Sequence, residues 1–82
     1  MLKVKLNSSA VQRAMAKRNM SQNMLAMRVG ISSGYISQLM CGTRCPSPMV
    51  RQRILDVLGL DFDDIFVIEE DRNEVPAGRY ED

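Results

Sequence analysis

The sequence predicts an all-α domain of five short helices, with a small two-stranded sheet formed by segments near the two ends of the chain. Side chains that can cap a helix N-terminus recur along the chain, at Asn7, Ser21, Ser32, Ser47 and Asp61. A chain of 82 residues is long enough for one hydrophobic core. We therefore predict one domain over residues 1–68, followed by an acidic, flexible tail over residues 69–82.

Two segments have the pattern of short strands. Residues 2–6 place Leu2, Val4 and Leu6 on one side and lysines on the other, which is the period of two of a β-strand. A second short strand is predicted over residues 66–68. These strands can pair with each other within one chain, or they can pair with a second copy across a two-fold axis.

Four helices and one further helical turn are predicted between these strands. The helices cover about residues 8–18, 22–29, 33–40 and 48–58, and the turn follows Asp61. The residues that end the four helices tolerate a positive φ, and they are Asn19, Gly30, Gly42 and Gly59. The apolar residues at helical spacing form the predicted core: Ala10, Val11, Ala14, Met15, Leu25, Ala26, Val29, Ile36, Leu39, Met40, Val50, Ile54, Val57 and Leu58.

The central stretch, residues 21–40, reads as two helices joined by a tight turn. Ala26 is small where two helices would cross closely, Gly30 allows the first helix to stop, and Ile36 follows on the buried side of the second helix. This spacing resembles a helix-turn-helix, in which the second helix lies in the major groove of DNA. The opposite side of the second helix is polar, with Ser33, Gly34, Ser37 and Gln38 at positions that share one face.

The formal net charge of +1 hides a strong asymmetry along the chain. Residues 1–60 hold nine basic side chains against Asp56 alone, a net charge of +8. Residues 61–82 hold Arg72 and Arg79 against nine acidic side chains, a net charge of −7. A basic body can bind phosphates, whereas the acidic end repels them and can shield the body or face another partner.

Composition argues against an enzyme and against a metal or cofactor. The chain lacks histidine, the usual general base near neutral pH, and neither cysteine has an imidazole partner to activate it. Cys41 and Cys45 alone are too few for a structural zinc site. We interpret them as reduced thiols in a loop, with a redox switch as the alternative. Since no run is apolar enough for a signal peptide or a membrane span, we expect a cytoplasmic protein.

Residues 8–66 resemble the five-helix DNA-binding domain of phage repressors and Cro proteins and of the XRE-type bacterial regulators. The caps, the central turn and the segment GLDFDDIF at residues 59–66 carry the resemblance. The resemblance implies that Gln22 binds a phosphate and that Arg44 binds the DNA backbone. It also implies a set of residues near base edges or nearby phosphates, namely Ser32, Ser33, Gly34, Ser37 and Gln38.

The chemistry of these residues is compatible with that role. The amide of Gln38 can donate and accept together, which matches the two edge groups of adenine, and Gly34 lets the backbone approach closely. A polar helix face is often only solvated, but such faces are normally rich in glutamate and lysine, and this face has neither. Tyr35 can pack at the helix edge or point its hydroxyl group at a phosphate, and we favour the phosphate.

One departure from the family pattern affects the core. Many relatives pair an arginine in the first helix with a glutamate near the end of the third, and the matching positions here are Met15 and Met40. Apolar packing can replace a buried ion pair because the desolvation cost of the charges disappears with the pair. We therefore predict that Met15 contacts Met40.

The sequence predicts a sequence-specific DNA-binding transcriptional regulator, namely a repressor that binds a palindromic operator through the helix at residues 33–40. Its expected partners are double-stranded DNA and a second copy, because one recognition helix reads too few base pairs to stand out in a genome. The alternative is a protein-interaction module of the same fold, an antitoxin or assembly factor, whose acidic tail binds a protein. No membrane is expected among its partners.

Overall fold

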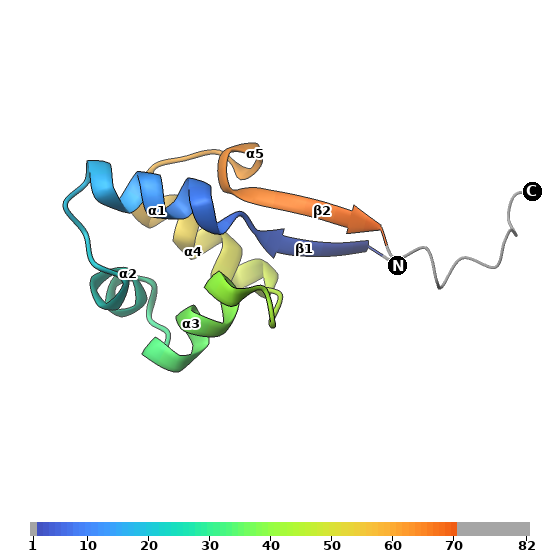
Figure 1. The fold of residues 1–82 in the computed structure, drawn as a ribbon, viewed down its shortest axis with the longest axis horizontal. Coiled ribbons are helices and arrows are strands. Elements are labelled where there is room, and N and C mark those ends of the chain that lie inside the picture. Colours follow the sequence, from blue (N-terminus) through green and yellow to red (C-terminus); the bar gives the residue numbers. More distant parts are fainter. Residues whose placement is uncertain (1, 71–82) are drawn as a thin grey trace, which may run out of the picture.

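The computed structural model describes residues 2–70 of the chain. Its elements, in order, are β1 (Leu2–Leu6), α1 (Ser8–Lys17), α2 (Gln22–Val29), α3 (Ser33–Cys41), α4 (Pro48–Leu58), α5 (Phe62–Ile65) and β2 (Phe66–Glu70). The helices gather in one bundle, and β1 and β2 lie side by side and project from it (Figure 1). The predicted fold class, five helices with a small two-stranded sheet, is confirmed.

Local capping chemistry sets the helix boundaries. The Ser21 and Ser32 hydroxyl oxygens accept hydrogen bonds from the backbone N–H groups of Met24 and Tyr35, at 3.1 and 3.0 Å. Asn7 and Ser47 cap α1 and α4 in the same way. The predicted stop residues have a positive φ, including the non-glycine Asn19 at 53°. The bounds of α2 and α4 are those predicted, whereas α3 continues one residue further, to Cys41.

The two strands pair antiparallel within the chain, from Leu2 opposite Glu70 to Leu6 opposite Phe66. The prediction that β2 ends at residue 68 was too short, because the strand continues to Glu70. The acidic residues extend the strand because β1 offers a partner for each of them, and the Lys5 ammonium lies 3.7 Å from the Glu69 carboxylate. Strand β2 therefore includes the first two residues of the predicted tail, and residues 71–82 lie outside the described residues.

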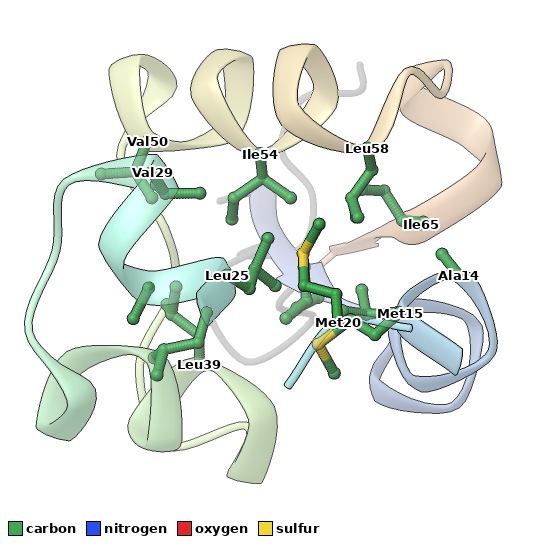
Figure 2. Close-up of a cluster of buried hydrophobic side chains, with 14 of the residues drawn as sticks. Ala14, Met15, Met20, Leu25, Val29, Leu39, Val50, Ile54, Leu58 and Ile65 are labelled. Atoms are coloured by element: carbon green, nitrogen blue, oxygen red, sulfur yellow. The ribbon is translucent and has the colours of Figure 1, made fainter. Parts of the chain in front are cut away.

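The core lies between the helices and the root of the sheet, and every helix contributes to it (Figure 2). Its largest fully buried side chains are Leu25, Ile36, Leu39, Ile54, Leu58, Ile65, Val11 and Val29. Three predicted core residues, Ala10, Met40 and Val57, are only partly buried and pack against its edge. The additional core members are Leu6, Met20, Ile65 and Phe66.

The predicted pair of methionines lies within or against one hydrophobic cluster. Met15 is buried, and Met40 is partly buried and packs against the core. Nearby, the Ser8 hydroxyl group donates a hydrogen bond to the Met40 carbonyl oxygen, which ties the start of α1 to the end of α3. A direct contact between the two methionine side chains stays a prediction.

Candidate nucleic-acid interface

The turn between α2 and α3 is fixed by backbone hydrogen bonds. Gly30 adopts a φ of 87°, and the N–H groups of Gly30 and Ile31 both donate to the Ala26 carbonyl oxygen, at 2.9 and 3.0 Å. Ser32 then caps α3 immediately after the turn. These contacts set the direction in which α3 leaves α2, so the orientation of the candidate recognition helix is specified by the chain around residue 30.

Helix α3 packs against the core with one face and exposes the opposite face to solvent. Ile36 and Leu39 are fully buried and fix the inner face in the core. The residues on the outer side are exposed, and they are Ser33, Gly34, Ser37 and Gln38. None of the residues of α3 is charged. The exposed surface is therefore rigidly supported, short-chained and rich in groups that both donate and accept hydrogen bonds.

Gln22 connects the beginning of α2 to this surface. Its side-chain Nε2 donates a hydrogen bond to the Ser37 hydroxyl oxygen, at 3.2 Å. The two elements of the motif are thereby linked through two predicted site residues that are 15 positions apart in the sequence. This bond does not use the Ser37 hydroxyl hydrogen or the side-chain amide oxygen of Gln22. Both groups therefore remain able to bind an external group.

The Ser32 hydroxyl group can accept one hydrogen bond and donate another. Its oxygen accepts the backbone N–H of Tyr35 at 3.0 Å, which stabilises the first turn of α3. Its hydroxyl hydrogen is left to donate, and an exposed donor at a helix N-terminus suits a phosphate oxygen. Ser32 thus contributes to helix stability whether or not it contacts DNA.

Arg44 is positioned by an aromatic ring that the sequence had not assigned to it. Its guanidinium carbon lies 5.1 Å from the ring centroid of Tyr35, which is the geometry of a cation–π interaction. Tyr35 is half-buried against the core, so its ring does pack at the edge of α3. The loop cation is therefore held next to the exposed surface of α3. A contact between the Tyr35 hydroxyl group and a phosphate stays a prediction.

This geometry gives a specific expectation for Tyr35. Tyr35→Phe keeps the ring under Arg44, so it should retain the cation–π contribution to DNA affinity, and any loss of affinity in this variant measures the predicted contact of the hydroxyl group with a phosphate. Tyr35→Leu removes the ring, and we expect it to weaken DNA binding about two- to fivefold, since an exposed cation–π pair contributes ~0.5–1 kcal/mol. Fluorescence anisotropy with a labelled duplex measures both. An equal loss in the phenylalanine variant would show that the hydroxyl group, rather than the ring, is the active part.

Two further residues shape the interface and were not identified from the sequence. Arg53 of α4 donates to the Val29 carbonyl oxygen at 3.4 Å, at the C-terminal end of α2, where a cation is favourable. A Cβ atom at Gly30 would come within 3.3 Å of the same guanidinium group. Thr43 donates its backbone N–H and its hydroxyl group to the Gln38 carbonyl oxygen. No local sequence signal identifies the Arg53 contact, because it joins residues 24 positions apart.

The described residues form few ion pairs and offer few possible metal ligands. Lys5 and Glu69 form the one ion pair between residues 2 and 70, so the cations of α2, α4 and the α3–α4 loop have no carboxylate partner there. Cys41 and Cys45 are exposed free thiols. Among the same residues, no cluster of three or more possible metal ligands occurs, and no helix is long and apolar enough to cross a membrane.

All eight predicted site residues lie on one continuous stretch of the fold: the start of α2, the cap and exposed side of α3, and the loop after it. A family model described as Helix-turn-helix matches residues 11–65, which include every one of these positions. The chain belongs to this helix-turn-helix family. It is of the Cro/C1, or XRE, type that the sequence resembles, and the predicted family is therefore confirmed.

Similar proteins agree with this membership. The chain is 30% identical over 64 residues to a Bacillus subtilis (strain 168) protein named as the uncharacterized HTH-type transcriptional regulator YvzC, covering 78% of this chain and 83% of that protein. The crystal structure of the transcriptional regulator VanUg, Form II, is similar in fold, with a TM-score of 0.66 and 24% identity over 85% of this chain and 89% of that one. The helix-turn-helix chain is thus a DNA-binding transcriptional regulator, a class of proteins that are not enzymes.

Proposed function

We propose that this regulator is a repressor that binds a palindromic operator as a homodimer, with α3 in the major groove. The observation that carries the proposal is the uncharged polar face of α3, which is exposed while Ile36 and Leu39 hold the opposite face in the core. A rigid helix with short polar side chains can approach base edges closely, which a face of long charged side chains cannot do as readily. The protein is proposed to act in the cytoplasm.

The roles of the site residues divide between base reading and phosphate binding. Gln38 is proposed to read a base, because its exposed amide can bind the paired donor and acceptor of adenine. Gln22, Ser32 and Arg44 are proposed to bind phosphates, since they border α3 at the start of α2, at the helix cap and in the loop. Ser33, Gly34, Tyr35 and Ser37 complete the predicted contact surface.

Arg44 provides a test of the phosphate contacts. We expect Arg44→Ala to weaken binding to all duplexes by a similar factor and to lower the slope of log affinity against log salt by about 1, because one phosphate contact is lost. The control is Arg13→Ala, which removes the same charge from an exposed position on α1. If both variants lose the same affinity and the same salt dependence, Arg44 has no local contact and acts through net charge alone.

The operator itself can be found directly. The purified full-length protein is incubated with sheared genomic DNA at physiological salt, and the recovered fragments are sequenced; low salt is avoided because phosphate contacts alone then retain most DNA. We expect enrichment of a palindrome with half-sites about one helical turn apart. Occupation of such a site across a promoter would block polymerase and repress transcription. No enriched sequence would overturn the operator proposal and favour the alternative, a helix-turn-helix module that binds a protein through its acidic end.

A further inference from the structure

A groove of about 280 Å³ lies between α1 and the segment that contains α5. Side chains between residues 10 and 18 line one side of this α1–α5 groove, and side chains between residues 60 and 65 line the other. None of the eight predicted DNA-binding residues is among them. Helices α1 and α5 lie on one side of the bundle and α3 lies on the other (Figure 1). A ligand in the groove would therefore leave the exposed surface of α3 free for DNA.

The floor of the α1–α5 groove is apolar and belongs to the core. Ala14 and Ile65 line the groove, are 6% and 1% exposed, and lie next to each other (Figure 2). Ala10 and Leu60 also line it and are partly buried against the same core. An apolar group that covered this floor would displace water from it, which is favourable.

Three cations border this floor. Arg13 and Lys17 are four positions apart on α1, so they project from the same side of the helix, and Arg18 follows directly after them. All three side chains are exposed, and none forms an ion pair with a carboxylate of residues 2–70. Like charges at this spacing repel each other. A bound anion would offset the repulsion, so the groove has a specific electrostatic need for one.

One of the three cations is already oriented. The Arg18 Nη1 atom donates a hydrogen bond to the Ala14 carbonyl oxygen, at 2.8 Å, which fixes the guanidinium group beside the apolar floor. A guanidinium group has five N–H donors, so most of them remain for a ligand. Its planar fork matches the two oxygens of a carboxylate or phosphate.

The one acidic residue of the lining leaves the groove cationic. The Asp64 Oδ2 atom accepts a hydrogen bond from the Asp61 backbone N–H, at 2.9 Å, as part of the capping box of α5. Three cations against this one carboxylate leave a net charge of 3 − 1 = +2 in the lining. The groove thus combines an apolar floor with an excess of positive charge.

We propose that the α1–α5 groove binds a small organic anion, namely a carboxylate or a phosphate ester with an apolar body. The anionic group would lie among Arg13, Lys17 and Arg18, and the apolar body would cover the floor. A volume of about 280 Å³ is close to the lower end of the range for small-molecule pockets, about 300–1,000 Å³. A standard protein interface involves about 20–30 residues a side, far more than line this groove. The proposal is independent of the operator, because it involves no DNA-binding residue.

Three related probes separate the contribution of charge from that of apolar contact. Benzoate and phenyl phosphate each join an anion to a benzene ring, whereas benzamide has nearly the shape of benzoate and no charge. Each probe is titrated into the ¹⁵N-labelled full-length protein without DNA, and sodium chloride keeps the ionic strength constant, because salt screens exposed charges. Since the cations are exposed, we expect dissociation constants in the millimolar range.

A pair of double variants tests whether the cations of the groove, rather than the net charge, bind the anion. Arg13→Gln combined with Lys17→Gln removes one arginine and one lysine from the groove. Lys3→Gln combined with Arg28→Gln removes the same two charges from exposed positions outside it. None of the four side chains is buried, so both double variants should keep the fold. Thermal melting by circular dichroism checks this.

We expect saturable shift changes at the groove residues with at least one of the two anions and none with benzamide. The groove variant should weaken binding of that anion about fivefold or more, and the control variant should leave it within about twofold of the wild type. Binding of phenyl phosphate alone would assign the natural ligand as a phosphate ester, and binding of benzoate alone would assign it as a carboxylate.

Three results would overturn the proposal. They are an absence of saturable shifts in the groove with both anions, an equal response to benzamide, and an equal loss of affinity in the two double variants. The first would mean that the groove binds no such anion, the second that the cations take no part, and the third that only net charge matters. Because the titration uses no DNA, none of these results bears on the operator proposal.

Discussion

Gln38→Ala is expected to reduce the preference for one base pair in each half-site by about 1–3 kcal/mol, which is about a 5- to 150-fold loss of discrimination. Binding to DNA of unrelated sequence is expected to change little, since the phosphate contacts remain. The reason is the position of Gln38: it is exposed on the face of α3 opposite the buried Ile36 and Leu39, and no backbone contact depends on its side chain. Its amide is thus free to bind a base edge.

Competition binding with a panel of duplexes that differ at single positions measures this effect. Gln12→Ala is the matched control, because Gln12 is the same residue type, exposed on α1. We expect the control to retain the wild-type preference at every position. If Gln38→Ala lowers affinity for all duplexes alike and changes no base preference, Gln38 contacts the backbone, and another residue of α3 reads the sequence.

Ile36→Ala is expected to lower the free energy of unfolding by about 2–5 kcal/mol, because it removes buried methylene and methyl groups and leaves a cavity that the core fills only in part. Ile36 has no exposed surface and fixes the inner face of α3 against the bundle. In a domain of this size each 1 kcal/mol corresponds to about 4–8 °C in Tm, so the variant should melt well below the wild type. Loss of DNA binding should follow from the loss of folded protein.

Urea denaturation and thermal melting measure the change. Met27→Ala on α2 is the control, since Met27 is 74% exposed and its truncation should change the free energy of unfolding by less than about 0.5 kcal/mol. Similar stabilities of the two variants would show that the α3 contact with the core is weaker than the burial of Ile36 indicates. Such a result would count against the inference that the core holds α3 rigidly in place for DNA binding.

The elements that the sequence predicted well are those with local causes. Ser21, Ser32 and Ser47 cap helices that begin at the next residue, and Gly30 and Gly59 end helices where a positive φ is needed. Each of these signals involves residues a few positions apart, so the bounds of α2 and α4 could be read from the chain. The polar face of α3 followed in the same way from helical spacing.

The features that the sequence missed depend on residues distant in the chain. The end of β2 was placed too early because Glu69 and Glu70 are polar, and their inclusion depends on partners in β1. The Arg53 contact with α2 and the Arg44 position over Tyr35 depend on how α4 and a loop pass the motif. The spacing and composition of the sequence do not indicate contacts between residues that are distant in the chain. These contacts could therefore be identified only from the structure.

NMR tests most directly whether the start of α2, helix α3 and the loop after α3 form the DNA-binding surface. A duplex that carries the enriched sequence is titrated into the ¹⁵N-labelled full-length protein, and amide shift changes are followed for each residue. We predict the largest changes at Gln22, over residues 32–38 and at Arg44, with small changes in α1 and α5. Changes concentrated on α1, α5 or the sheet, with α3 unaffected, would contradict the claim.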